Sequence, residues 1–224
     1  MTWTRALLLA VALGLSHPAA AEVITHLPGT DKVVALTFDA CESISPAHLD
    51  SKLVDVLERE GVPYTVFVSG RFARHHQAEL AALAASGRVE IENHSFNHPQ
   101  HMENLSPERV REELTETDAL LQAITGKPTK FFRFPAGSYD ARTLAQVESL
   151  GYRVVHWGTP SGDPSPAVDA DRMTRGVLAN TRPGAIHIFH INGRGWHTAE
   201  AMPRIVADLK SRGYRFVRLE EVLR

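Results

Sequence analysis

The sequence predicts an α/β barrel in which seven parallel strands alternate with helices. Short apolar runs alternate with longer amphipathic segments along almost the whole chain, and this order implies parallel strands joined by right-handed helical crossovers. The apolar runs are also nearly continuous, as in strands that are buried on both faces. Seven such units favour a complete or incomplete barrel, and a doubly wound open sheet is the alternative.

The predicted strands are apolar runs bounded by glycine, proline and polar residues. They cover residues 32–38, 64–68, 88–92, 130–134, 152–157, 185–190 and 214–219. The predicted helices lie between them, at residues 46–60, 71–86, 106–125, 141–150, 170–180 and 198–211, and residues 158–166 form a loop. The clearest helix start is Ser106-Pro107, because serine caps a helix and proline suits its first turn.

The first 21 residues have the three parts of a secretory signal peptide. Arg5 precedes the apolar run Ala6–Leu15, and Ala19-Ala20-Ala21 forms a cleavage site before Glu22. A bilayer span needs about 20 apolar residues, so this shorter run is not predicted to be a membrane anchor. We therefore predict a single domain at residues 22–224, exported to the periplasm or the medium.

The composition excludes some classes of function. With 24 basic and 26 acidic residues and no basic block, the chain is not predicted to bind nucleic acid. No later segment is predicted to span a membrane. Cys41 is the only cysteine, so there is no internal disulfide framework. The sequence does not indicate an oligomeric state.

Two histidines, His94 and His98, stand four residues apart after the third predicted strand. This spacing lets two imidazoles reach one divalent ion, and imidazole suits zinc, cobalt and nickel better than calcium or magnesium. Pro99 disfavours a helical conformation at His98, so the pair is expected in a loop. Two ligands alone do not define a metal site, and the neighbouring residues must supply the rest.

Polar residues gather just after the predicted strands. In barrels and in open sheets, the carboxyl ends of parallel strands carry the chemistry. We therefore predict that the following side chains share one active site: Asp39, His94, His98, Arg133, Asp163 and His190.

These segments, in this order, resemble the polysaccharide deacetylase family, the NodB-like domain of carbohydrate esterase family 4. The resemblance covers about Val33 to Leu223 and implies a deformed (β/α)7 barrel. It also implies a metal-dependent hydrolase that removes N-acetyl groups from a polysaccharide such as peptidoglycan or chitin. The motifs that carry it are Thr37-Phe38-Asp39-Ala40, His94 to Pro99, Arg133 to Gly137, Trp157 to Asp163 and Ile188-Phe189-His190.

The resemblance implies catalytic roles for four residues. Asp39 looks like the general base that takes a proton from water, and Arg133 looks like the group that orients it. His190 looks like the general acid that protonates the departing amine, and Asp163 looks like its partner. A divalent ion, zinc or else cobalt or nickel, would polarise the water and the carbonyl.

The implied metal ligands are His94 and His98, but the family's usual third ligand is missing. The first motif normally has a second aspartate, where this chain has Ala40. We favour Glu42 as the replacement because it offers a carboxylate, and Cys41 is an alternative. Direct binding by Asp39, or two histidines with water alone, are further alternatives.

The resemblance also implies substrate contacts. The backbone N–H of Ala136 would help to hold the oxyanion. Pro135 and Trp157 would line the substrate site. Trp196, in the polar, glycine-rich segment 192–197, is predicted either to stack on a sugar ring or to lie in a solvated turn.

Two other functions are alternatives. Ala40 would suit a sugar-binding protein that has lost catalysis, although such a protein needs neither the base Asp39 nor the acid His190. A metal-independent hydrolase of cyclic amides, an activity of some relatives, would not need both His94 and His98.

Overall fold

The described residues of the computed structural model, 22–42 and 47–223, form a parallel sheet that curls into an incomplete barrel. The named strands pair in the order β5-β4-β3-β2-β1-β7-β6, with β8 beside β1, which confirms the predicted fold class. They are β1 (Val33–Ala40), β2 (Tyr64–Val68), β3 (Val89–Asn93), β4 (Phe131–Phe132), β5 (Arg153–Val154), β6 (Thr159–Pro160), β7 (Ala185–His190) and β8 (Arg215–Phe216). The predicted signal peptide, residues 1–21, lies outside the described residues.

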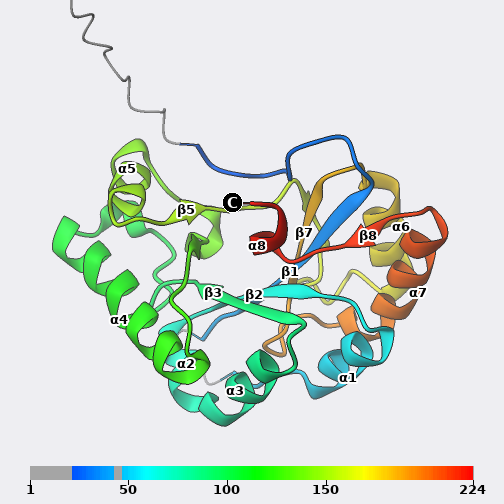
Figure 1. Cartoon of the computed structure of the whole chain (residues 1–224), viewed down its shortest axis with the longest axis horizontal. Coiled ribbons are helices and arrows are strands. Elements are labelled where there is room, and N and C mark those ends of the chain that lie inside the picture. Colours follow the sequence, from blue (N-terminus) through cyan, green and yellow to red (C-terminus); the bar gives the residue numbers. More distant parts are fainter. Residues whose placement is uncertain (1–21, 43–46, 224) are drawn as a thin grey trace, which may run out of the picture.

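Most of the helices cover the outer side of the curled sheet in an arc that runs from α5 and α4 through α3 and α1 to α7 and α6 (Figure 1). In the part of the chain that is described, no helix is long and apolar enough to cross a membrane. The helices are α1 (Ser51–Glu60), α2 (Gly70–His75), α3 (Gln77–Ala85), α4 (Pro107–Thr125), α5 (Ala141–Ser149), α6 (Ala170–Asn180), α7 (Thr198–Ser211) and α8 (Leu219–Val222), with 3-10 helices η1 (Met102–Asn104) and η2 (Pro135–Gly137).

The segment before β1 joins two distant parts of the sheet. Ile24 forms a parallel bridge with Val155, just after β5. His26 forms an antiparallel bridge with Ala185, the first residue of β7. This segment, dark blue in Figure 1, therefore helps to close the barrel where no named strand completes it.

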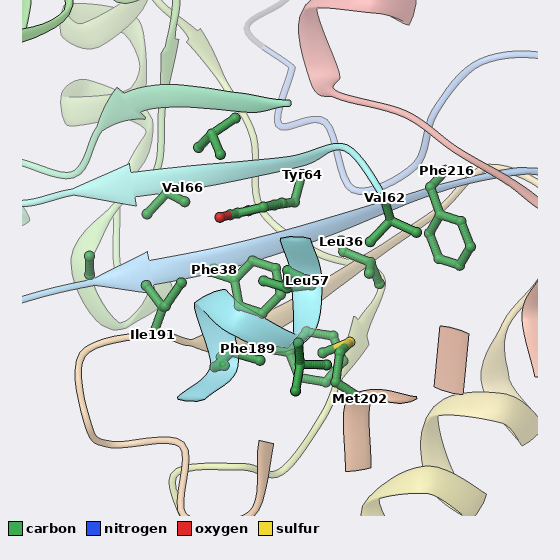
Figure 2. Packing of buried hydrophobic residues seen from close by; sticks show 14 of the residues in the cluster. Leu36, Phe38, Leu57, Val62, Tyr64, Val66, Phe189, Ile191, Met202 and Phe216 are labelled. Atoms are coloured by element: carbon green, nitrogen blue, oxygen red, sulfur yellow. The ribbon is translucent and has the colours of Figure 1, made fainter. Parts of the chain in front are cut away.

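β1 separates two hydrophobic clusters, because successive side chains of a strand point to opposite faces. Its even-numbered residues, from Val34 to Ala40, pack with α1 and α7, and Figure 2 shows Leu36 and Phe38 in this cluster. Its odd-numbered residues Val33 and Ala35 belong to a second cluster. Further along the strand, the odd-numbered Thr37 and Asp39 both contact Arg133, a fully buried residue.

Several elements differ from the prediction because of contacts with distant residues. The predicted helix 71–86 is two helices, α2 and α3, since the backbone leaves the helical region at His76, whose Nε2 lies 3.0 Å from the Ala47 carbonyl. The last predicted strand ends early, because the N–H of Leu219 donates to Thr65 Oγ1 at 3.2 Å and α8 begins there. β6 lies in the predicted loop 158–166 and pairs with β7.

The start of α1 also differs from the prediction. α1 begins at Ser51, because the side chain of Asp50 caps it by accepting a hydrogen bond from Leu53 N. The predicted start at Pro46 lies outside the described residues.

Two glutamates of β3 are buried close together. Glu90 Oε2 accepts a hydrogen bond from Thr65 Oγ1 at 2.7 Å. Glu92 Oε2 accepts from the N–H groups of Lys130 and Phe131, both at 2.8 Å. Burial raises the pKa of Glu92 well above its usual value, and repulsion from Glu90 raises it further.

The raised pKa of Glu92 makes stability depend on pH in a defined direction. The folded protein keeps a proton that the unfolded chain releases near pH 4.3 or so, the ordinary value for glutamate. The favourable contribution of Glu92 is therefore complete below that pH and is lost as the pH rises through the folded-state pKa.

We expect Glu92→Gln to be more stable than the wild type at pH 8, by on the order of 1–3 kcal/mol, with the difference shrinking toward pH 4. Glutamine keeps an acceptor oxygen for both backbone N–H groups and removes the charge. Chemical unfolding across this pH range measures the effect, with the exposed Glu79→Gln as control. A difference that stays constant with pH would contradict the raised pKa.

Candidate active site

Arg133, the residue after β4, is fixed in the barrel interior by four hydrogen bonds. Its Nη1 donates to Asp39 Oδ1 at 2.7 Å, and its Nη2 donates to Thr37 Oγ1 at 2.8 Å. Nη2 and Nε also donate to the carbonyls of His156 and Val155. The guanidinium carbon lies 4.0 Å from the ring centroid of Phe67. These contacts leave the side chain one orientation.

Asp39 is a buried carboxylate held in its ionised form. Burial by itself raises the pKa of Asp39, but the charge of Arg133, with smaller contributions from His94 and His190, lowers it overall. Oδ1 is occupied by Arg133, whereas Oδ2 faces His94 Nε2 at 3.5 Å. Asp39 is therefore an ionised carboxylate with one oxygen directed toward His94.

His94 has the protonation and orientation of an imidazole that can bind a metal ion. Its Nδ1 lies 2.8 Å from the Arg133 carbonyl and must donate to it, so Nε2 carries the lone pair of the neutral ring. Burial lowers the pKa of His94, although Asp39 opposes that effect. Nε2 is buried, and no described residue forms a hydrogen bond with it. A buried lone pair left unpaired in this way fits a cation.

His98 lies in a tight loop rather than on a helix, as Pro99 predicts. His98 and Ser95 have left-handed backbone angles, with φ of 54° and 63°. Burial, helped by the nearby His94, lowers the pKa of His98 to about 3, so the ring is neutral. The two ring centroids are 4.9 Å apart. Gln100 Nε2 lies 3.0 Å from His98 Nδ1, which leaves Nε2 for another partner.

Glu113 of α4 holds this loop in place. Its carboxylate accepts hydrogen bonds from the N–H groups of Phe96 and Asn97, at 2.8 and 2.7 Å, and from the Asn97 side chain at 2.7 Å. Sequence reasoning missed Glu113. The available signal was a carboxylate on a buried helix stripe, between Val110 and Leu114.

The residues after β1 do not place Glu42 where it was predicted to be, beside the two histidines. The Glu42 carboxylate lies 2.8 Å from His75 Nδ1 and also accepts a hydrogen bond from the Ala47 N–H. Ligand atoms of Cys41, His94 and His98 instead lie within 4.8 Å of one another, and all three residues are buried. Glu42 is directed to other partners because neighbouring residues of an extended chain point to opposite sides.

His190 and Asp163 form a second pair of side chains joined by a hydrogen bond. Asp163 Oδ1 lies 2.9 Å from His190 Nδ1, while Oδ2 accepts from the His190 backbone N–H and from Thr198 Oγ1. Nε2 of His190 is therefore the nitrogen left to exchange a proton. His190 is the register partner of Asp39 on the adjacent strands β7 and β1. The two sequence-predicted catalytic groups thus lie side by side.

Asp39, His98 and His190 open onto one cleft of about 240 Å³. Arg133 and His94 are buried and do not belong to its lining. Ala136, which lines it, has a left-handed φ of 54°. The lining also includes Asp39, His98, Trp157, Asp163, His190 and Arg194.

The structure does not bring all the predicted substrate residues to this cleft. Pro135 is buried in η2 and does not line it. Trp196 is 61% exposed and lines a different surface hollow, beside α1. Trp196 therefore lies outside this cleft, and its contact with substrate stays a prediction.

Comparisons with known proteins agree with this geometry. A family model described as polysaccharide deacetylase matches residues 26–155. The chain is 31% identical over 198 residues to a chitooligosaccharide deacetylase of Rhizobium leguminosarum bv. trifolii, covering 82% of this chain and 88% of the relative. It is 30% identical over 189 residues to a peptidoglycan-N-acetylglucosamine deacetylase of Bacillus cereus, covering 83% of this chain and 66% of that relative.

A solved structure shows the same architecture. It is a peptidoglycan N-acetylglucosamine deacetylase in complex with 4-naphthalen-1-yl-N-oxidanyl-benzamide. The TM-score is 0.81 at 28% sequence identity, and the match covers 89% of this chain and 92% of that one.

We expect Glu113→Ala to loosen the histidine loop. The variant leaves three N–H donors of the loop without their acceptor, which should cost about 1–3 kcal/mol of unfolding free energy. Hydrogen exchange at Phe96 and Asn97 should also accelerate. Glu112→Ala on the exposed side of the same helix is the matched control, expected to stay within about 0.5 kcal/mol. Equal effects of the two substitutions would contradict the role of Glu113.

Proposed function

The chain belongs to the polysaccharide deacetylase family, and we propose that it is a metal-dependent hydrolase that removes N-acetyl groups from an N-acetylated polysaccharide of the peptidoglycan or chitin type. The observation that carries this proposal is the pairing of Asp39 with His190 on neighbouring strands, beside the unpaired Nε2 of His94. A charged base, a proton donor and a nitrogen that can bind a metal ion are the groups that metal-dependent amide hydrolysis requires.

His94 and His98 would hold the ion, with a third ligand considered below. A divalent ion bound there would polarise the acetyl carbonyl and lower the pKa of a water molecule. The residues fit such an ion because both imidazoles are neutral and His94 Nε2 has no hydrogen-bond partner among the described residues. Asp39 accepts the proton of the attacking water through Oδ2, the oxygen that Arg133 does not use.

His190 completes the reaction on the leaving side. As the water oxygen bonds to the acetyl carbon and the C–N bond breaks, the sugar nitrogen takes a proton from His190 Nε2. The Asp163 carboxylate keeps Nδ1 engaged, so that Nε2 is the nitrogen directed to substrate. The products are acetate and a free amino sugar.

The size and location of the cleft also support the proposal that it binds a small acyl group. Its volume, about 240 Å³, is below the roughly 300–1,000 Å³ of sites that enclose a drug-sized molecule. Trp157 at its edge offers an aromatic surface for a sugar ring. The predicted signal peptide supports export from the cytoplasm, to the compartment in which cell-wall polymers of this kind occur.

Acetate release tests the proposed reaction. We expect the purified protein to release acetate from peptidoglycan or N-acetylglucosamine oligomers, to lose this activity with a chelator, and to regain it with zinc or cobalt. Binding of the oligomers without release would instead favour the sugar-binding alternative. Release that a chelator does not change would indicate a metal-free hydrolase.

Substitutions at the two proton-transfer residues should affect the chemical step. We expect Asp39→Asn and His190→Ala each to lower kcat by about 10²–10⁴-fold, because each removes general acid–base catalysis. The exposed His101→Ala is the control, and its kcat should match that of the wild type. Unchanged kcat in Asp39→Asn would remove Asp39 from the mechanism.

A further inference from the structure

We propose that Cys41 is the third protein ligand of the metal site, so that one thiolate and two imidazoles hold the ion. This inference rests on the metal-dependent function proposed above. Among the described residues, the group of potential ligand atoms at this position consists of Cys41, His94 and His98. Their ligand atoms lie within 4.8 Å of one another. Cys41 follows β1 and the two histidines follow β3, and β2 lies between these strands in the sheet.

The direction of the chain at the end of β1 selects Cys41 over its neighbours. Ala40 packs into the hydrophobic cluster that lies against α1 and α7. Cys41 is two residues after Asp39 and therefore returns to the side of the strand that faces the site. Glu42 points away again, with its carboxylate between His75 and the Ala47 N–H. Ala40, at the position of the family's usual carboxylate, offers no ligand atom, whereas the next residue, Cys41, offers a thiol.

A second observation points independently to a ligand. His94 is almost completely buried, and its Nε2 has no hydrogen-bond partner among the described residues. The other ring nitrogen donates to the Arg133 carbonyl, so the unpaired atom is a lone pair rather than an N–H group. Histidine ligands of metal ions commonly have this arrangement.

Two hydrogen-bond donors lie beside the sulfur of Cys41. Asn192 Nδ2 lies 3.2 Å from Cys41 Sγ, and Arg194 Nη1 lies 3.9 Å from it. A metal-bound thiolate accepts hydrogen bonds from donors of this kind. The softer sulfur ligand should also favour zinc and cobalt over magnesium and manganese, more strongly than a carboxylate would.

Cobalt spectroscopy and metal titration test the proposal. Cobalt(II) bound to the purified wild-type protein should show a thiolate-to-cobalt charge-transfer band in the near ultraviolet, and Cys41→Ser should lack it. Zinc affinity, measured by competition with a chromophoric chelator, should fall at least about 10-fold in Cys41→Ser. Cys41→Asp should recover affinity without the band. Glu42→Gln, which keeps an acceptor for the Ala47 N–H, is the matched control and should retain both.

The outcomes separate this proposal from the proposed function. A wild-type cobalt spectrum without the band overturns the ligand assignment even if the protein releases acetate, and this test does not depend on whether Cys41→Ser folds. Loss of both the band and the affinity in Glu42→Gln, with both kept in Cys41→Ser, also overturns it. If the band is present but no acetate is released, Cys41 binds the metal and the proposed reaction fails.

Discussion

The site depends on the buried ion pair between Arg133 and Asp39. Removing two charges from water costs several kcal/mol per ion, and the attraction between them repays this only when the remaining donors are also satisfied. Arg133 largely meets that condition, because three of its other four N–H groups bond the Thr37 hydroxyl and two backbone carbonyls. Loss of one partner would leave the other charge buried alone, at a cost of about 3–5 kcal/mol.

The same arginine connects Asp39 with His94. Its side chain orients Asp39 and lowers the carboxyl pKa, while its backbone carbonyl accepts the Nδ1–H of His94. Arg133 therefore sets both the charge of Asp39 and the tautomer of His94. Since both bonds are buried, solvent competes little with them. The ionisation of Asp39 and the orientation of His94 are thus linked through Arg133.

Backbone strain is concentrated at the rim. Ser95, His98 and Ala136 are the non-glycine residues with positive φ in the described chain. Each such conformation costs on the order of 1–3 kcal/mol and persists only where its surroundings hold it. Glu113, from the helix layer outside the sheet, provides this support for the histidine loop. The helices of the outer layer therefore help to shape the site as well as cover the core.

Local sequence patterns by themselves determined much of the fold, because they reflect local preferences. The Ser106-Pro107 start predicted α4, and the apolar runs located β1, β2 and β7 to within a few residues. Parallel topology then placed Asp39 and His190 at one rim. Only the tertiary structure decided that Cys41 rather than Glu42 lies beside the two histidines. It also decided that Trp196 lies outside the cleft and that Glu113 binds the backbone of the histidine loop. These outcomes depend on the pleat at a strand end and on partners distant in the chain, such as His75, which no local pattern encodes.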